Sequence, residues 1–121
     1  MAPPRAASDP FVAIADPTRR AILDLLRRGE TPFAEIADRF PMSAPAISRH
    51  LRVLREARLV RERRDGRDKR QRLYHFDPAP LRDVVEWARV YQLYWEGNVA
   101  RLKQHVERKR ARGESRDAHR K

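Results

Sequence analysis

Apolar residues in the first half of the chain recur every three or four positions, which is the period of one helix face. This pattern predicts four successive helices, each starting at a residue that can cap free backbone N–H groups. The expected caps are Ser8 or Asp9, Asp16 followed by Pro17, Thr31 followed by Pro32, and Ser43. The first half of the chain is therefore predicted to be a small helical domain.

After the fourth helix, helical spacing gives way to short apolar runs separated by charged residues. Leu59-Val60 starts one expected strand, and residues 73–76 (LYHF) form the other. Residues 65–70 between them are polar and begin with Asp-Gly, a dipeptide typical of hairpin turns. The sequence thus predicts a two-stranded β-hairpin directly after the fourth helix.

A long helix is expected at the end of the chain. Asp77, followed by proline, is a capping signal, and helical spacing continues for about 30 residues to roughly Arg108. The predicted order is α-α-α-α-β-β-α, a mainly helical fold with a small hairpin. Residues 1–8 are expected to be a flexible leader, 9–108 one domain, and 109–121 a basic disordered tail.

The fourth helix has one apolar and one polar side. At 100° per residue, Ile47, Leu51 and Leu54 fall close together and should be buried. The opposite side carries Ser48, Arg49 and Arg52. An α-helix fits the major groove of DNA, where its N-terminal residues meet base edges. The outer side of this helix is therefore a candidate surface for reading DNA.

Arginine is well suited to a base contact, because one guanidinium can span O6 and N7 of guanine. Arg49 is accordingly the best candidate for that role, and Ser48 could donate to a base or a phosphate. Arg52 is expected on the DNA backbone. Thr31 and Ser43, at helix N-termini beside the turn, are further phosphate candidates.

The positive charge of the chain is concentrated in two places. Lys and Arg number 28 and Asp and Glu 17, a net charge of +11, of which residues 58–72 and residues 108–121 each carry +5. Localised positive charge indicates a polyanionic partner. Arg67, beside the turn glycine, is best placed to enter a minor groove. The candidate contacts in the hairpin are Arg63, Arg64, Arg67, Lys69, Arg70 and Arg72.

A helix-turn-helix joined to a charged hairpin is typical of a winged helix-turn-helix protein that reads duplex DNA. A winged-helix module that binds protein or RNA is the alternative, although it would more often expose apolar residues on the fourth helix. Zero cysteines exclude disulfides and thiolate sites, and no phosphate loop or nucleophile elbow is present. We therefore expect no enzyme, no metal and no cofactor. No apolar run is long enough for a membrane span, so we expect a cytoplasmic protein.

Three stretches of the chain resemble the ArsR/SmtB family of bacterial winged-helix repressors. They are DPTRRAILDLL (16–26), EIADRFPMSAPAISRHLRVLREARLV (35–60) and RRDGRDKRQRLYHF (63–76). The resemblance extends over residues 9–106. It implies a homodimeric, operator-binding transcriptional regulator of the bacterial cytoplasm that is associated with the nucleoid through its DNA.

The resemblance also implies which residues contact DNA and which build the dimer. The family's DNA-reading positions correspond to Ala44, Pro45, Ser48 and Arg49, and the hairpin, or wing, makes a second contact. The first and last helices of the family form most of the dimer interface. Each expected role therefore falls on a definite part of this chain.

The chain departs from the family at the metal sites. The founding members sense metals through cysteines in the third helix or through Asp/His sets on the last helix. Here the third-helix stretch PFAEIADRF lacks a thiol, and none of the four histidines is three or four residues from another. A metal site needs convergent ligands, so the chain resembles a metal-independent branch. We expect His50 to be packed and hydrogen-bonded. An effector is also expected, either a small molecule or a protein, and its identity is unknown.

The last helix has an aromatic stripe that a protein of this size does not need for its own core. Pairing with a second copy about a two-fold axis explains it, and two half-sites about one helical turn apart would follow. A pocket for an effector at the same seam is a second interpretation, and simple dimer packing is the plainer one. The residues expected in the dimer interface are Trp87, Tyr91, Tyr94, Trp95 and Leu102.

Overall fold

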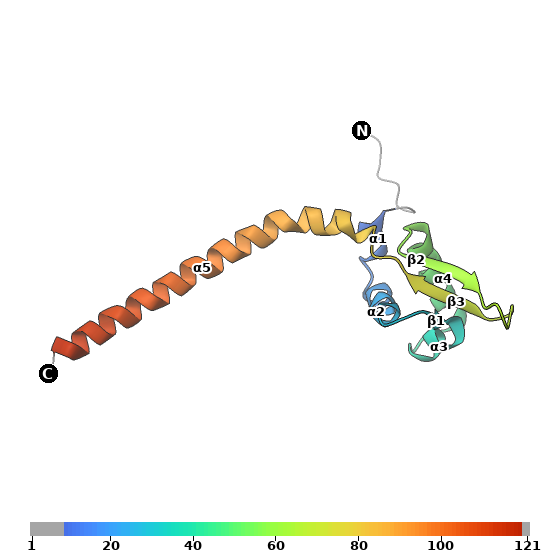
Figure 1. Ribbon diagram of the computed structural model, residues 1–121, viewed down its shortest axis with the longest axis horizontal. Coiled ribbons are helices and arrows are strands. Elements are labelled where there is room, and N and C mark those ends of the chain that lie inside the picture. Colours follow the sequence, from blue (N-terminus) through green and yellow to red (C-terminus); the bar gives the residue numbers. More distant parts are fainter. Residues whose placement is uncertain (1–8, 120–121) are drawn as a thin grey trace, which may run out of the picture. The chain divides into compact units, whose positions relative to one another are not determined.

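The structure is a computed structural model that describes residues 9–119. Residues 1–8, which we expected to be a flexible leader, and residues 120–121 lie outside the described residues, as do the side chains of Val99 and of residues 114–119. The chain divides into two compact units, residues 1–84 and 85–121. The elements, labelled in Figure 1, are α1 (Pro10–Ala13), α2 (Pro17–Leu26), β1 (Thr31–Pro32), α3 (Phe33–Asp38), α4 (Ala44–Glu56), β2 (Val60–Arg64), β3 (Arg72–Phe76) and α5 (Leu81–His119).

The predicted hairpin is present as β2 and β3, but it belongs to a three-stranded antiparallel sheet with the order β1-β3-β2. The additional strand places Thr31 opposite Tyr74. Our prediction that Thr31 begins a helix was therefore wrong, because Thr31 pairs with Tyr74 in the sheet and its hydroxyl donates to the Gly29 carbonyl instead of capping a helix. Helix α3 begins two residues later, at Phe33. The predicted fold class, mainly helical with a small hairpin and a long last helix, is confirmed.

The core of the first unit forms where α2, α3 and α4 meet the sheet. Ile47, Leu51 and Leu54, the stripe predicted for α4, are each at most 1% exposed. Complete burial of a side chain of this size contributes roughly 1.5–3 kcal/mol. Tyr74 from β3 is buried among them, and burial raises the pKa of its hydroxyl. This packing determines which side of α4 faces outward.

Side-chain caps start three helices at the residues that the sequence predicted. Asp9 accepts a hydrogen bond from a backbone N–H of α1 at 2.8 Å. Asp16 Oδ2 accepts from the Arg19 N–H at 3.0 Å, and Ser43 Oγ accepts from the Ala46 N–H at 3.3 Å. Each cap satisfies an N–H group that has no partner inside its helix. The local signals therefore fixed where α1, α2 and α4 begin.

Helix α4 ends in a tight turn that leads directly into β2. Arg58 has a φ of 61°, in the left-handed region. The Leu59 N–H donates to the Leu54 carbonyl at 3.0 Å, and the Arg58 N–H donates to the Arg55 carbonyl at 2.9 Å. This is the Schellman arrangement, and its usual hydrophobic contact is available because Leu54 and Leu59 are both buried. The turn ties the wing closely to the end of α4.

Helix α5 differs from the prediction at both ends. It begins at Leu81, because Asp77 caps a turn by accepting a hydrogen bond from the Ala79 N–H at 3.0 Å. It continues to His119, so the segment after Arg108 that we expected to be disordered is helical as far as it is described. That segment is rich in Ala, Arg, Lys and Glu, which favour helix, and lacks proline. Between residues 9 and 119, no helix combines the length and apolarity needed to cross a membrane.

Candidate nucleic-acid interface

The outer side of α4 presents three side chains that we predicted to contact DNA. Arg49 and Arg52 are exposed, and Ser48 is half-buried. Among the described residues, neither guanidinium has a hydrogen-bond or ion-pair partner. Each guanidinium therefore keeps its N–H donors available for an external acceptor. The buried stripe on the opposite side holds these residues in place without engaging them.

The N-terminal end of α4 is narrow. Ala44 and Pro45 are both exposed and carry short side chains. The Ser43 hydroxyl accepts a hydrogen bond from the Ala46 N–H, and its own proton can still be donated. A surface of this kind allows the helix backbone to come close to a groove wall. The three positions stay candidates for DNA contact on these grounds.

Thr31 does not fit the role of phosphate contact that we expected. Its side chain is only 6% exposed, and its hydroxyl donates to the Gly29 carbonyl at 2.9 Å. The residue lies in β1 and not at a helix N-terminus. Phosphate binding at a helix end requires free N–H groups pointing outward. We therefore remove Thr31 from the candidate interface.

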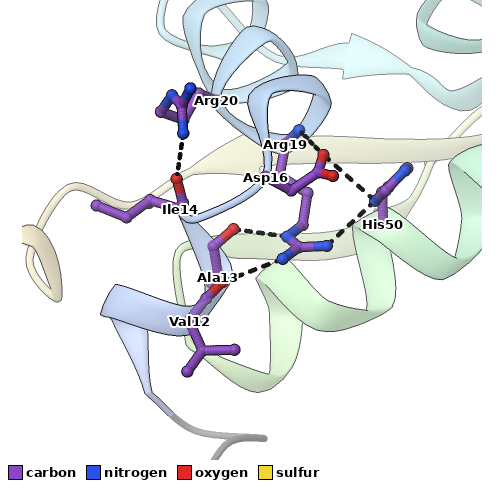
Figure 2. A network of polar contacts seen from close by, with 7 residues as sticks. All are labelled: Val12, Ala13, Ile14, Asp16, Arg19, Arg20 and His50. Atoms are coloured by element: carbon purple, nitrogen blue, oxygen red, sulfur yellow. Dashed lines mark hydrogen bonds and ion pairs between the residues drawn. The ribbon is translucent and has the colours of Figure 1, made fainter.

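A polar network joins α4 to the first two helices, with Arg19 at its centre (Figure 2). Arg19 Nε donates to the Ala13 carbonyl at 2.6 Å, and Nη2 donates to the Val12 carbonyl at 3.0 Å. Arg19 Nη1 donates to His50 Nδ1 at 3.4 Å. His50 Nδ1 also lies 3.9 Å from Asp16 Oδ2. The prediction of a packed, hydrogen-bonded histidine agrees with this position, which is next to Arg49 on α4.

The sequence did not reveal the structural role of the arginines that follow Pro17. Arg20 Nη1 donates to the Ile14 carbonyl at 2.8 Å, so Arg19 and Arg20 both satisfy carbonyls at the end of α1 (Figure 2). The backbone N–H of Arg19 also lowers the pKa of the Asp16 carboxyl. An ionised carboxylate is favourable at this helix N-terminus. The segment therefore anchors α1 and positions α4 in the fold.

Two of the six wing cations are held by partners inside the fold. Arg63 donates from Nε and Nη2 to the Glu30 carboxylate at 2.8 and 2.5 Å, and these bonds lower the pKa of Glu30. The guanidinium of Arg72 lies 4.4 Å from the centre of the Phe33 ring, within range of a cation–π interaction. Arg63 and Arg72 therefore contribute to the structure of the sheet, and DNA contact by these two residues stays a prediction.

Two further ion pairs hold the base of the wing, and sequence reasoning missed both. Arg55 of α4 pairs with Glu62 of β2. Arg61 Nη2 lies 3.0 Å from Asp77 Oδ2. The Ala79 N–H is the main cause of the lowered pKa of Asp77, and the Arg61 charge adds to it. Because these acids neutralise cations at the base, the uncompensated charge lies nearer the tip.

The turn at the tip of the wing is stabilised by its own acids. Asp65 Oδ1 accepts from the backbone N–H of Arg67, and Asp68 Oδ1 accepts from that of Arg70, each at 3.0 Å. These bonds are made by backbone N–H groups to the two carboxylates, so the basic side chains take no part in them. Four wing cations are exposed, and their side chains have no partner in the described part of the chain. They are Arg64, Arg67, Lys69 and Arg70.

On α5, the side chains predicted for the dimer interface are all exposed, by between 49% and 67%. The rings of Trp87 and Tyr91 contact each other, with centroids 5.0 Å apart and planes tilted by 49°. A shallow hollow on the same side of the helix is lined by Trp87, Ala88, Tyr91, Gln92 and Trp95. An exposed cluster of this size on one helix is characteristic of an interface.

Groups of three His, Asp or Glu side chains that could hold a metal ion do not occur among the side chains that the structure describes, those of residues 9–98 and 100–113. Cysteine is absent from the sequence. His50 is engaged with Arg19, as described above.

Comparison with known proteins gives three matches that agree. Residues 16–62 match the family described as "Bacterial regulatory protein, arsR family". The chain is 41% identical over 78 residues to the transcriptional repressor SdpR of Bacillus subtilis, an alignment that covers 64% of this chain and 82% of SdpR. It is 46% identical over 69 residues to the HTH-type transcriptional regulator Rv2034 of Mycobacterium tuberculosis, covering 57% of this chain and 62% of Rv2034.

A solved structure supports the same relationship. The crystal structure of an ArsR family transcriptional regulator, RHA00566, matches with a TM-score of 0.61 and 35% sequence identity. The match covers 71% of this chain and 86% of that one. The likeness therefore extends to the three-dimensional arrangement of the elements.

Proposed function

We propose that this chain, which belongs to the ArsR family of bacterial regulatory proteins, acts as a homodimeric repressor on a near-palindromic operator. Members of this family are DNA-binding transcriptional regulators and not enzymes. The observation that carries the proposal is the outer side of α4. There Arg49 and Arg52 stand exposed and unpaired among the described residues, while the opposite side is fully buried.

Sequence readout is assigned to α4. Arg49 lies in the second turn, close enough to the helix start to meet base edges when α4 lies in a major groove. Ser48 is beside it, and the short side chains of Ala44 and Pro45 let the groove wall approach. Arg52, one turn further along, and the Ser43 hydroxyl contact the sugar-phosphate backbone. The network around Arg19 keeps α4 in register with the rest of the domain.

The wing supplies the second contact, through four cations. Arg64, Arg67, Lys69 and Arg70 surround the turn, where the acids are bound to backbone N–H groups. Their charge is complementary to phosphates, and Arg67 is the residue we assign to the minor groove. Arg63 and Arg72 stabilise the base of the wing through their contacts with Glu30 and Phe33.

The dimer interface is assigned to α5 and α1. Trp87, Tyr91, Tyr94, Trp95 and Leu102 of α5 are exposed in one protomer, and Val12 of α1 is 38% exposed. A second copy related by a two-fold axis would cover both sets and fix the separation of the two reading helices. Two-fold symmetry then predicts half-sites about one helical turn, roughly 34 Å, apart on the DNA.

Repression is assigned because SdpR, a relative that the chain matches over most of its length, is named a transcriptional repressor. A dimer seated on an operator can exclude other proteins from the same DNA, which requires affinity and sequence selectivity but no further chemistry. The same surface therefore accounts for both binding and repression.

Selection of bound sites from random duplex DNA at about 150 mM salt tests the proposal, because nonspecific phosphate binding is weak at that ionic strength. We expect an enriched motif with two-fold symmetry. Binding without an enriched motif would contradict the proposal and favour a winged-helix module that contacts protein or RNA. An asymmetric motif would contradict the homodimer alone.

A further inference from the structure

The C-terminal part of α5 differs in chemistry from the aromatic part that precedes it. Residues 101–113 contain six Lys/Arg and a single acid, Glu107, which gives this segment a net charge of +5. All thirteen of these residues are exposed. The aromatic part, residues 85–100, contains one Arg and two Glu. One helix thus carries an apolar segment followed by a strongly basic segment.

Three of the six Lys/Arg residues, together with His105, lie along one side of the helix. Arg101, His105, Arg108 and Arg112 are spaced i, i+4, i+7 and i+11, which places them within about 60° of one another at 100° per residue. We call these four residues the basic stripe. Its length is about 16 Å at 1.5 Å per residue. One strand of duplex DNA has a phosphate every 3.4 Å or so along the axis, so the stripe can reach several phosphates.

A helix side that serves only solubility usually mixes charges, because i, i+4 pairs of opposite sign stabilise it. Elsewhere in this chain arginines have acidic partners, as in the pairs Arg63–Glu30 and Arg61–Asp77. Within the described residues no ion pair engages the basic stripe. Arg108 and Arg112 are like charges at i, i+4, and such a pair destabilises a helix. A polyanionic partner removes that repulsion.

A membrane surface also attracts basic amphipathic helices, but such helices need a broad apolar side. Between residues 101 and 113 only Leu102 and Val106 are large apolar residues. A DNA-binding regulator, in contrast, is already held near phosphates. We propose that the basic stripe of α5 binds the phosphate backbone of duplex DNA without reading sequence, as a contact separate from α4 and the wing.

Two matched triple variants test this proposal in the full-length protein. The first replaces three residues of the basic stripe, Arg101→Gln, Arg108→Gln and Arg112→Gln. The second replaces the three basic residues outside the stripe, Lys103→Gln, Lys109→Gln and Arg110→Gln, of which Lys109 lies nearest to it. Both variants lose three charges, so they differ only in the position of the loss. Circular dichroism at 222 nm checks that α5 keeps its helicity in each.

The measurement is the salt dependence of binding to random duplex DNA and to the selected operator. Each phosphate contact contributes about 0.9 to the slope of log K against log salt. The stripe variant is expected to lose about 2 to 3 from the slope per protomer, equally on both DNAs, so that the specificity ratio stays unchanged. The off-stripe variant is expected to lose less than 1. Equal losses in the two variants, or none in the stripe variant, would overturn the proposal.

The same variants distinguish the partner. Anionic vesicles of phosphatidylserine and phosphatidylcholine serve as the membrane probe. If the stripe variant loses vesicle binding while its DNA binding stays at the wild-type level, the stripe contacts membranes and the proposal is wrong. This inference rests on DNA binding but not on base reading by Arg49. Failure of Arg49→Ala to change specificity would therefore contradict the proposed readout and leave the stripe result standing.

Discussion

Helices α4 and α5 both carry an apolar stripe at helical spacing, yet the two stripes meet different surroundings. On α4, Ile47, Leu51 and Leu54 are at most 1% exposed. On α5, Tyr91 is 49% and Trp95 is 65% exposed. The α4 stripe is covered by the protein's own core, and this covering leaves a charged side free for DNA. The α5 stripe is larger and more aromatic, and we infer that a second copy of the chain covers it.

The contrast shows that hydrophobic periodicity identifies a buried helix side but not what buries it. Stability of the first unit and assembly of two chains are then separate properties, set by different helices. Substitutions in the buried stripe of α4 should change folding, and substitutions in the exposed stripe of α5 should change association.

Leu51→Ala should lower the free energy of unfolding by about 2–5 kcal/mol, because it leaves a cavity in a fully buried site. Urea denaturation followed by circular dichroism measures the change. The control is Arg52→Ala, which replaces the next residue in the chain, on the exposed side of α4. It should change the free energy of unfolding by about 0.5 kcal/mol or less. Similar losses in both variants would contradict the burial of one side only.

Trp95→Ala should weaken dimerisation by about 2 kcal/mol or more, since a large aromatic near the centre of an interface is a typical hot spot. Sedimentation velocity over a range of concentrations measures the effect. Leu93→Ala removes an equally exposed apolar side chain on the other side of α5 and is the control. A dimer that weakens as much with the control would place the interface elsewhere on the helix.

Arg49→Ala should weaken operator binding by about 1–3 kcal/mol and relax base preference at one position in each half-site. The reason is the loss of a bidentate base contact that no other residue replaces. Arg28→Ala, an exposed arginine at the end of α2, removes the same charge as a control. Competition with operator and random duplex measures the ratio. Equal loss on both DNAs would make Arg49 a phosphate contact.

Asp16→Ala should destabilise the fold by about 1 kcal/mol at pH 7, because it removes an N-cap. The pKa of Asp16 is lowered in the folded protein, so its contribution is present above the unfolded pKa of about 3.9 and disappears as pH falls through the folded pKa. Unfolding curves of both proteins from pH 7 to pH 2 should therefore converge at the acidic end. A constant difference over that range would contradict the role of the ionised carboxylate.

Arg58→Gly should stabilise the protein by about 0.5–1 kcal/mol, the smallest of these effects. Arg58 adopts a positive φ that glycine adopts without steric strain. Urea denaturation measures the gain, and Arg55→Gly inside α4 should be destabilising instead. Loss of stability in the Arg58 variant would show that its side chain contributes more than its backbone strain costs.

Much of the first unit could be predicted from the sequence because its signals are local. Asp16 and Ser43 cap their helices as expected, and the stripe of α4 is buried as its spacing indicates. The hairpin followed from apolar runs on either side of an Asp-Gly turn. The family resemblance extended these local predictions to a DNA-binding fold.

What the sequence did not show depends on contacts between distant residues. Thr31 became part of a strand because it pairs with Tyr74, 43 positions later, and Arg63 is bound by Glu30, 33 positions earlier. Neither partner is marked by any local pattern. The extension of α5 past Arg108 has a different reason: the polar composition of that segment predicts disorder, but its Arg, Lys and Ala residues have high helix propensity.

The central claim is that two copies of the chain, joined through α5, read one operator with two α4 helices. Sedimentation equilibrium of the protein bound to a single selected operator, and to a duplex that carries one half-site, tests it most directly. We predict two 14.3 kDa chains on the operator and at least tenfold weaker binding to the half-site. One chain per operator, with equal affinity for the half-site, would contradict the claim.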